Sequence, residues 1–210
     1  MTEHKTMNTV VHAAFRRDLN RFDRSLASFP AGSRHRADQL NRVWAFFENE
    51  LHQHHHYEED VFWPALQSTG VDLSLVEDLG AEHEVLREAL VDATTAMTRL
   101  GLDPSGGAAS SARSSIGRLT DVLFKHLDHE ERDMEPISAA HANRPEMKAA
   151  VKRVIKSHRG QLGSLVAWLQ DGADADARRG LRREIPPPVV FLLATLPGRK
   201  YRRDIGSVWT

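Results

Sequence analysis

Residues 51–67 read LHQHHHYEEDVFWPALQ, and residues 123–139 read LFKHLDHEERDMEPISA. The two stretches share one pattern: a histidine, a glutamate four residues later, a second glutamate beside it, and then a proline. These residues are His54, Glu58, Glu59 and Pro64 in the first stretch, and His126, Glu130, Glu131 and Pro136 in the second. Residues four apart lie on one face of an α-helix, so each stretch is expected to present a histidine and a glutamate together.

The segments that precede these stretches also correspond to each other. His12-x2-Phe15-Arg16-x2-Leu19 matches His83-x2-Leu86-Arg87-x2-Leu90. The chain therefore has the pattern of a duplicated helical hairpin, in which each half contributes two histidines and one glutamate.

Apolar residues step by 3 and 4 through the first 140 residues, which predicts four long amphipathic helices. Their apolar stripes cover residues 15–29, 43–65, 76–100 and 116–137. Proline and glycine interrupt the pattern between them, and Ser33 is expected to cap the second helix. Long helices joined by short loops pack as antiparallel neighbours. We expect an all-α fold, an up-down four-helix bundle over residues 1–142.

Residues 143–210 are expected to form a fifth helix and a C-terminal extension that packs on the bundle. Asn143 is the expected N-cap, with Pro145 in the first turn. The apolar stripe of this helix runs from Met147 to Leu169. A polar stretch, a proline-containing segment, a short apolar run and a basic cluster at 199–203 follow, and the basic cluster is expected to be solvated.

Six polar residues occupy positions on the apolar stripes where leucine would be expected. They are His12, His54, Glu58, His83, His126 and Glu130. An unpaired buried carboxylate costs several kcal/mol, and a multivalent cation removes that cost. At ~1.5 Å rise per residue, all six reach one level of an antiparallel bundle. We therefore predict that they are the ligands of a pair of metal ions.

The other histidines are not expected to be ligands. His52, His55, His56 and His129 fall on neighbouring helix faces, solvated or behind the ligands, whereas His4, His35 and His141 are expected at the surface or in loops. His158 lies on the apolar stripe of the fifth helix. Core packing is the favoured interpretation there, and approach to the metals is the alternative.

The composition excludes several classes of protein. The formal net charge of −1 gives no long-range attraction to nucleic acid or anionic membrane. The absence of cysteine excludes disulfides, thiolate catalysis and iron–sulfur clusters. The first residues lack the apolar run of a signal peptide, and the run at 189–196 is too short to span a bilayer. We expect a cytoplasmic protein without nucleic-acid or membrane partners, and the oligomeric state stays open.

These residues resemble the hemerythrin-like, or HHE cation-binding, family over about residues 8–140. The strongest pieces are His54-x3-Glu58-Glu59-x2-Phe62-Trp63-Pro64 and His126-x3-Glu130. The resemblance implies a four-helix bundle with an oxo- or hydroxo-bridged di-iron centre. His12, His54, His83 and His126 would be terminal ligands, and Glu58 and Glu130 would bridge. Mixed imidazole and carboxylate ligands suit iron or manganese, with zinc a weaker alternative.

The sequence departs from the oxygen-carrying hemerythrins in two places. The carriers have a further histidine one turn before the position of His83, where this chain has Leu79. They also use His-x4-Asp on the last helix, where this chain has His-x3-Glu. Four imidazoles shared between two irons leave an open position on each, which favours turnover of a small oxidant over reversible oxygen carriage.

Three functions compete at this point. The favoured one is a di-iron oxidoreductase that turns over hydrogen peroxide or nitric oxide in oxidative and nitrosative stress defence. The second is a protein that binds, senses or stores oxygen or iron without turnover. The third is a purely structural role, in which the metals hold the helices together. Open coordination positions favour the first two, and the expected ligand is peroxide or a diatomic molecule.

Overall fold

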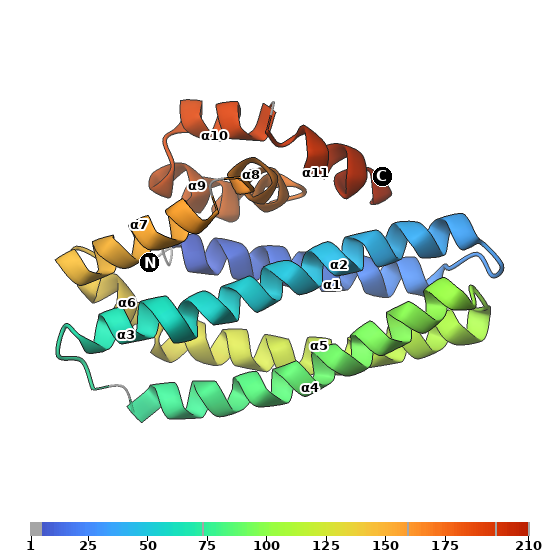
Figure 1. Ribbon diagram of the computed structural model, residues 1–210, viewed down its shortest axis with the longest axis horizontal. Coiled ribbons are helices and arrows are strands. Elements are labelled where there is room, and N and C mark those ends of the chain that lie inside the picture. Colours follow the sequence, from blue (N-terminus) through green and yellow to red (C-terminus); the bar gives the residue numbers. More distant parts are fainter. Residues whose placement is uncertain (1–5, 73, 159, 196, 210) are drawn as a thin grey trace.

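The computed structural model describes residues 6–72, 74–158, 160–195 and 197–209, and every regular element within them is a helix. Four long helices lie side by side (Figure 1): α1 (Met7–Ala27), α2 (Arg34–Tyr57), α4 (Ser74–Leu102) and α5 (Gly106–Asp133). Both α1 and α4 contact α2 and α5, which closes the four into a helical bundle. The predicted all-α class is confirmed.

Side-chain caps fix where these helices begin. The hydroxyl of Ser33 accepts a hydrogen bond from the backbone N–H of Arg36, as predicted. The backbone of Gly32 has a φ of +85°, a left-handed conformation that other residues rarely adopt. Its N–H donates to the carbonyl of Pro104 over 2.6 Å, which joins the turn after α1 to the turn after α4.

Two prolines end regular α-helix at matching places in the two halves. α2 passes into the π-helix η1 (Glu58–Phe62) and then α3 (Trp63–Gln67), whereas α5 ends at Asp133 before α6 (Glu135–His141). Pro64 and Pro136 lack an N–H, and each ring crowds the carbonyl four residues earlier. The distortion therefore falls within the turn that follows each of the predicted ligands Glu58 and Glu130.

Aromatic side chains pack together in the middle of the bundle. The ring of Phe15 meets Phe47 edge-on, with centroids 5.6 Å apart, and Trp44 stacks on Phe47 at 5.4 Å. Each fully buried ring contributes roughly 2–3 kcal/mol to stability. A second apolar cluster covers the end of the bundle next to the predicted ligands. Its buried residues are Trp63, Leu66, Leu79, Met134 and Met147.

The predicted fifth helix is two helices. α7 (Pro145–Ser157) begins with a proline as predicted, but its N-cap is Arg144, without a side-chain hydrogen bond, rather than Asn143. The chain leaves the helix at His158 and re-enters it as α8 (Leu162–Gln170). Gly160, a weak helix former, lies in the break. The two pieces pack on different elements: α7 on α3 and η1, and α8 on α1.

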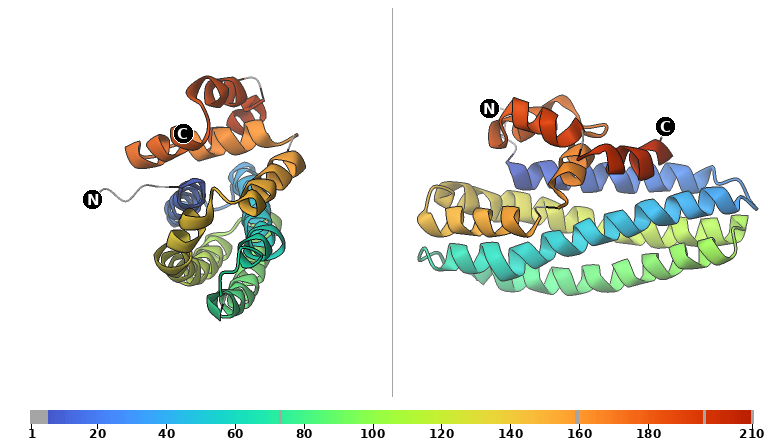
Figure 2. Two further views of the ribbon diagram at one scale, coloured as in Figure 1. Left: turned by 90° about the vertical axis from the view of Figure 1, so that its left-hand side faces the viewer. Right: turned by 45° about the horizontal axis from the view of Figure 1, so that its top comes forward.

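The segment expected to be an extension is helical as well. α9 (Ala175–Glu184), α10 (Pro187–Thr195), α11 (Arg199–Asp204) and the 3₁₀-helix η2 (Gly206–Val208) follow α8. Together they lie along one side of the bundle, next to α1 and α2 (Figures 1 and 2). Within the basic cluster, Tyr201 is buried and donates to the carboxylate of Asp171 over 2.9 Å, so only its basic neighbours are solvated.

A buried carboxylate fastens this layer to α1. Asp18 is fully buried and accepts from the indole N–H of Trp168 over 2.7 Å and from the guanidinium of Arg17 over 2.9 Å. Buried charges persist where they are paired in this way. The predicted division of the chain at residue 142 stays a prediction. Within the described ranges, no helix is both long and apolar enough to cross a bilayer.

Candidate metal centre

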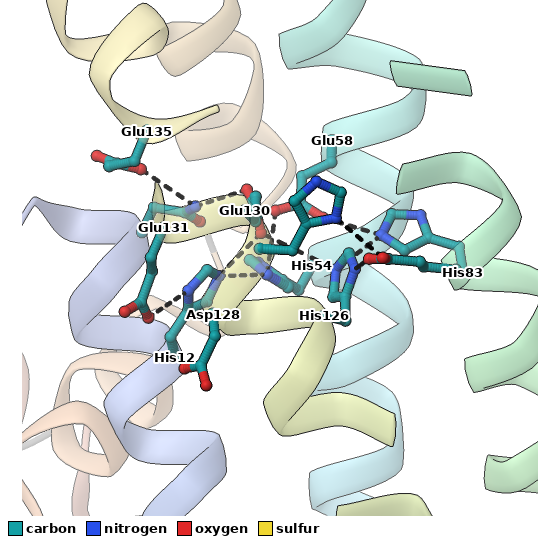
Figure 3. Close-up of polar contacts among 12 residues, drawn as sticks. His12, His54, Glu58, His83, His126, Asp128, Glu130, Glu131 and Glu135 are labelled. Carbon is teal, nitrogen blue, oxygen red and sulfur yellow. Dashed lines mark hydrogen bonds and ion pairs between the residues drawn. The ribbon is translucent and has the colours of Figure 1, made fainter. Parts of the chain in front are cut away.

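The six predicted ligands converge in the interior of the bundle (Figure 3). His12 comes from α1, His54 from α2, Glu58 from the start of η1, His83 from α4, and His126 and Glu130 from α5. Five of these side chains are buried, and His54 is nearly so. The structure therefore brings together all the residues that interrupt the apolar stripes.

The six predicted ligands, together with His55, form two groups of candidate ligand atoms. Within each group the atoms lie no more than 4.8 Å apart. One group is His12, His54, Glu58 and Glu130, and the other is His55, Glu58, His83 and His126. Glu58 belongs to both groups, so its two oxygens are placed to serve two neighbouring cations. An oxygen and nitrogen donor set of this kind suits iron or manganese.

Carboxylates outside the two groups hold three of the imidazoles from behind. The Nδ1 atoms lie 2.9 Å from Glu131 for His12, 2.6 Å from Glu59 for His83, and 2.9 Å from Glu82 for His126. A carboxylate only accepts hydrogen bonds, so each Nδ1 carries a proton, and in the neutral ring Nε2 keeps its lone pair and faces inward. Metal-binding histidines are typically held by such an outer partner.

Several inward atoms have no suitable hydrogen-bond partner among the residues that the structure describes. The Nε2 atoms of His83 and His126 are 3.2 Å apart, although both present lone pairs. Both oxygens of Glu58 and one oxygen of Glu130 are buried without a hydrogen bond, although ring nitrogens lie at ion-pair distance. Such groups are costly when they are left unpaired. Cations between them would accept every one of these lone pairs, so the residues fit a two-metal site.

Protons balance the charge of this cluster when no cation is bound. Burial lowers the pKa of His12, but the carboxylates of Glu130 and Glu131 outweigh burial and raise this pKa to about 9. Burial and the neighbouring Glu130 raise the pKa of Glu58 well above its ordinary value. At neutral pH His12 therefore holds a proton, and the surroundings of Glu58 favour its neutral form; a bound cation would displace the protons from both groups.

Of the two positions expected for His55, solvated or behind the ligands, burial rules out the first. This residue is not on a solvated face: its side chain is 6% exposed, and its ring stacks on His83 with centroids 4.1 Å apart and planes at 23°. Burial and the nearby His83 hold the pKa of His55 well below its ordinary value, so the ring is neutral. The sequence did not decide this burial, because His55 precedes Glu58 by three residues, a spacing that permits a shared helix face without requiring it.

The remaining histidines of the described residues belong to neither group. His52, His56 and His35 are exposed as predicted, His141 is half-buried, and His4 lies outside the described residues. His129 stands behind the cluster, where its Nδ1 is 2.9 Å from Glu82. His158 caps α7 with its ring 5.0 Å from that of Tyr57, and it belongs to neither group.

Two further sets of residues support the cluster and were missed by the sequence reasoning. Arg16 lies 2.6 Å from Glu131, and Arg87 lies 3.2 Å from Glu59, so each of these two carboxylates joins a histidine to an arginine. The duplicated His-x3-Arg and Glu-Glu patterns were the signal for this arrangement. The amide of Asn8 donates to Glu130 over 2.9 Å, and nothing in the sequence singled it out.

An all-helical chain that gathers imidazoles and carboxylates from four helices belongs to the class of metal-binding helical bundles. Within that class, the chain belongs to the hemerythrin HHE cation-binding domain family, whose model matches residues 9–137. Comparisons with curated proteins and with solved structures found no match. The predicted resemblance is confirmed, and the family together with the His/Glu cluster supports binding of a cation, typically iron.

Proposed function

We propose that this chain is a non-haem di-iron protein in which α1, α2, α4 and α5 form an antiparallel up-down bundle. The proposed ligands are the six residues predicted from the sequence: His12, His54, Glu58, His83, His126 and Glu130. The observation that carries the proposal is the arrangement around Glu58. Outer carboxylates hold the rings of His83 and His126 so that Nε2 faces inward, and both Glu58 oxygens have no hydrogen-bond partner among the described residues. Manganese is the second choice of metal, and zinc is a weaker one.

The proposed activity is the turnover of hydrogen peroxide. One peroxide molecule is oxidised to dioxygen and gives up two electrons and two protons, and a second accepts them and becomes two water molecules. Bound iron supplies the exchange of electrons between the two molecules. Nitric oxide offers a parallel reaction, because two nitric oxide molecules and one peroxide balance as two molecules of nitrous acid.

The residues around the cluster supply two further requirements of this chemistry. Trp63, Leu79 and Leu86 are buried beside it and exclude bulk water. The charged pair of Glu131 and Arg16 holds the Nδ1 proton of His12, which keeps Nε2 available to the metal throughout turnover.

Oxygen binding or sensing without turnover is the second candidate, and His55 is the observation that favours it. Two open irons were expected because the sequence offered four imidazoles, and the structure brings a fifth next to His83 and His126. One metal with three imidazoles beside another with two is the arrangement expected of a protein that binds oxygen reversibly.

One experiment separates the two functions. The iron-loaded protein is mixed with peroxide, with and without nitric oxide, and consumption is compared with that of the Glu58→Ala variant. In parallel, the reduced protein is cycled between air and argon while its optical spectrum is recorded. Consumption that depends on Glu58 supports turnover. Reversible spectral change without peroxide consumption would instead establish oxygen binding.

A further inference from the structure

We propose that His55 is a third imidazole ligand of the metal that His83 and His126 hold. This inference rests on the proposed function, because it concerns the same site. The oxygen carriers have their further histidine on the helix equivalent to α4, whereas His55 lies on α2. In this chain Leu79 occupies that position, and it is fully buried in the apolar cluster with Trp63. No ligand can reach the metal from there.

The geometry around His55 supports this role. One of its ligand atoms lies within 4.8 Å of those of Glu58, His83 and His126. Its ring stacks on His83 and meets His126 nearly at right angles, with centroids 5.5 Å apart. The ligand nitrogens of the three imidazoles thus lie close enough together to be offered to one cation.

A purely structural role for His55 leaves a polar atom unexplained. Its Nε2 is buried and has no hydrogen-bond partner among the residues that the structure describes. A buried nitrogen without a partner destabilises the fold, and leucine would fill the same space without that cost. The matching position in the other half of the duplicated pattern is in fact a leucine, Leu127, which is fully buried.

Helix geometry explains how adjacent residues can serve different metals. Neighbouring positions on an α-helix point about 100° apart. His54 faces the group of His12 and Glu130, and His55 faces the group of His83 and His126. Glu58 is four residues from one and three from the other, so it lies between them and belongs to both groups.

The inference makes the two metals unequal despite the duplicated sequence. One would have three imidazoles and the oxygen of Glu58, and the other would have His12, His54 and oxygens from Glu58 and Glu130. Each metal would then have four protein ligands, so the two would differ in the kind of ligand and not in the number.

The test compares His55→Ala with His56→Ala, a matched control because His56 is exposed and pairs with Asp60 at 2.8 Å. Each protein is loaded with ⁵⁷Fe(II) without oxygen, desalted, analysed for iron and examined by Mössbauer spectroscopy. His55→Leu is included in case the alanine variant folds poorly, and circular dichroism of the metal-free proteins checks folding. We expect about two irons in the parent and in His56→Ala, with two distinct signals.

Both His55 variants should lose about one iron per chain, together with one of the two signals. Added imidazole should restore that signal in His55→Ala, since it can enter the space left by the side chain. If folded His55 variants keep about two irons and both signals, the ligand role is overturned while the di-iron proposal stands. If the parent itself binds no iron, the proposed function fails together with this inference.

Discussion

The Nδ1 atom of His83 lies 2.6 Å from the carboxylate of Glu59, which in turn contacts the guanidinium of Arg87. The same relationship recurs in the other half of the bundle, from His12 through Glu131 to Arg16. Glu59 and Glu131 each follow directly after a predicted metal ligand in the sequence. In each Glu-Glu pair, the first glutamate therefore places an oxygen in the cluster, and the second holds the Nδ1 of a histidine on another helix.

This relationship predicts that Glu59→Gln weakens metal binding although Glu59 is not a ligand in the proposed centre. A neutral amide holds the Nδ1 proton less strongly, and loss of such an outer partner typically costs 10–100-fold in metal affinity. Glu84→Gln is the matched control, because Glu84 also pairs with Arg87 but is exposed. Titration with Fe(II) under argon measures the effect. Equal affinities for the two variants would show that the outer carboxylate has no such role.

A second prediction concerns the buried carboxylates. Glu58→Ala combined with Glu130→Ala should abolish the binding of about two irons per chain and the stabilisation that the metals give to the fold. Replacement of the exposed Glu77 and Glu88 by alanine should change neither quantity. Iron analysis and thermal unfolding with and without iron measure both. A double variant that retained its iron would disprove the assignment.

The stability of the metal-free protein should fall at alkaline pH. The folded protein holds a proton on His12 up to about pH 9, whereas an unfolded histidine loses it near 6.5. This contribution is fully present below pH 6.5, disappears as the pH rises through 9, and amounts to about 3 kcal/mol. The raised pKa of Glu58 acts in the same direction, because its neutral form is the one that the folded state tolerates.

Urea unfolding between pH 6 and 10 measures this dependence. In the His12→Gln variant the free energy of unfolding should fall less between pH 6 and 10, because the proton held by His12 no longer contributes to it. Iron affinity should rise over the same range, since cations displace protons from His12 and Glu58. A metal-free parent whose unfolding free energy is constant over this range would contradict the proposed proton balance.

A fourth prediction concerns the attachment of the C-terminal helices to the bundle. Trp168→Phe keeps most of the buried apolar surface but removes the N–H that donates to the fully buried Asp18. Loss of a hydrogen bond to a buried charge should lower the free energy of unfolding by about 1.5–3 kcal/mol. Phe191→Ala is the control, because Phe191 is 71% exposed and should have little effect. Equal stability of the two variants would mean that the Asp18 contact contributes nothing.

The sequence by itself determined the helical class and the candidate cluster. Apolar residues at steps of 3 and 4 define a buried face, and a glutamate such as Glu58 on that face stands out because its burial needs compensation. The duplicated pattern also contained the two prolines, but the predicted helices ran through them, and the distortions that follow Glu58 and Glu130 were found only in the structure. The sequence could not place the end of α7 near His158, because that break depends on which elements α7 and α8 pack against.

Only the tertiary structure separated His55 from His56. The two residues are neighbours in a run of three histidines, and helical periodicity alone leaves either on the border between the buried and the solvated face. The packing of α4 against α2 buries the ring of His55 beside His83, while His56 remains exposed. The outer carboxylates are likewise decided in three dimensions, since Glu59 and His83 lie on different helices and meet only when those helices pack at one register.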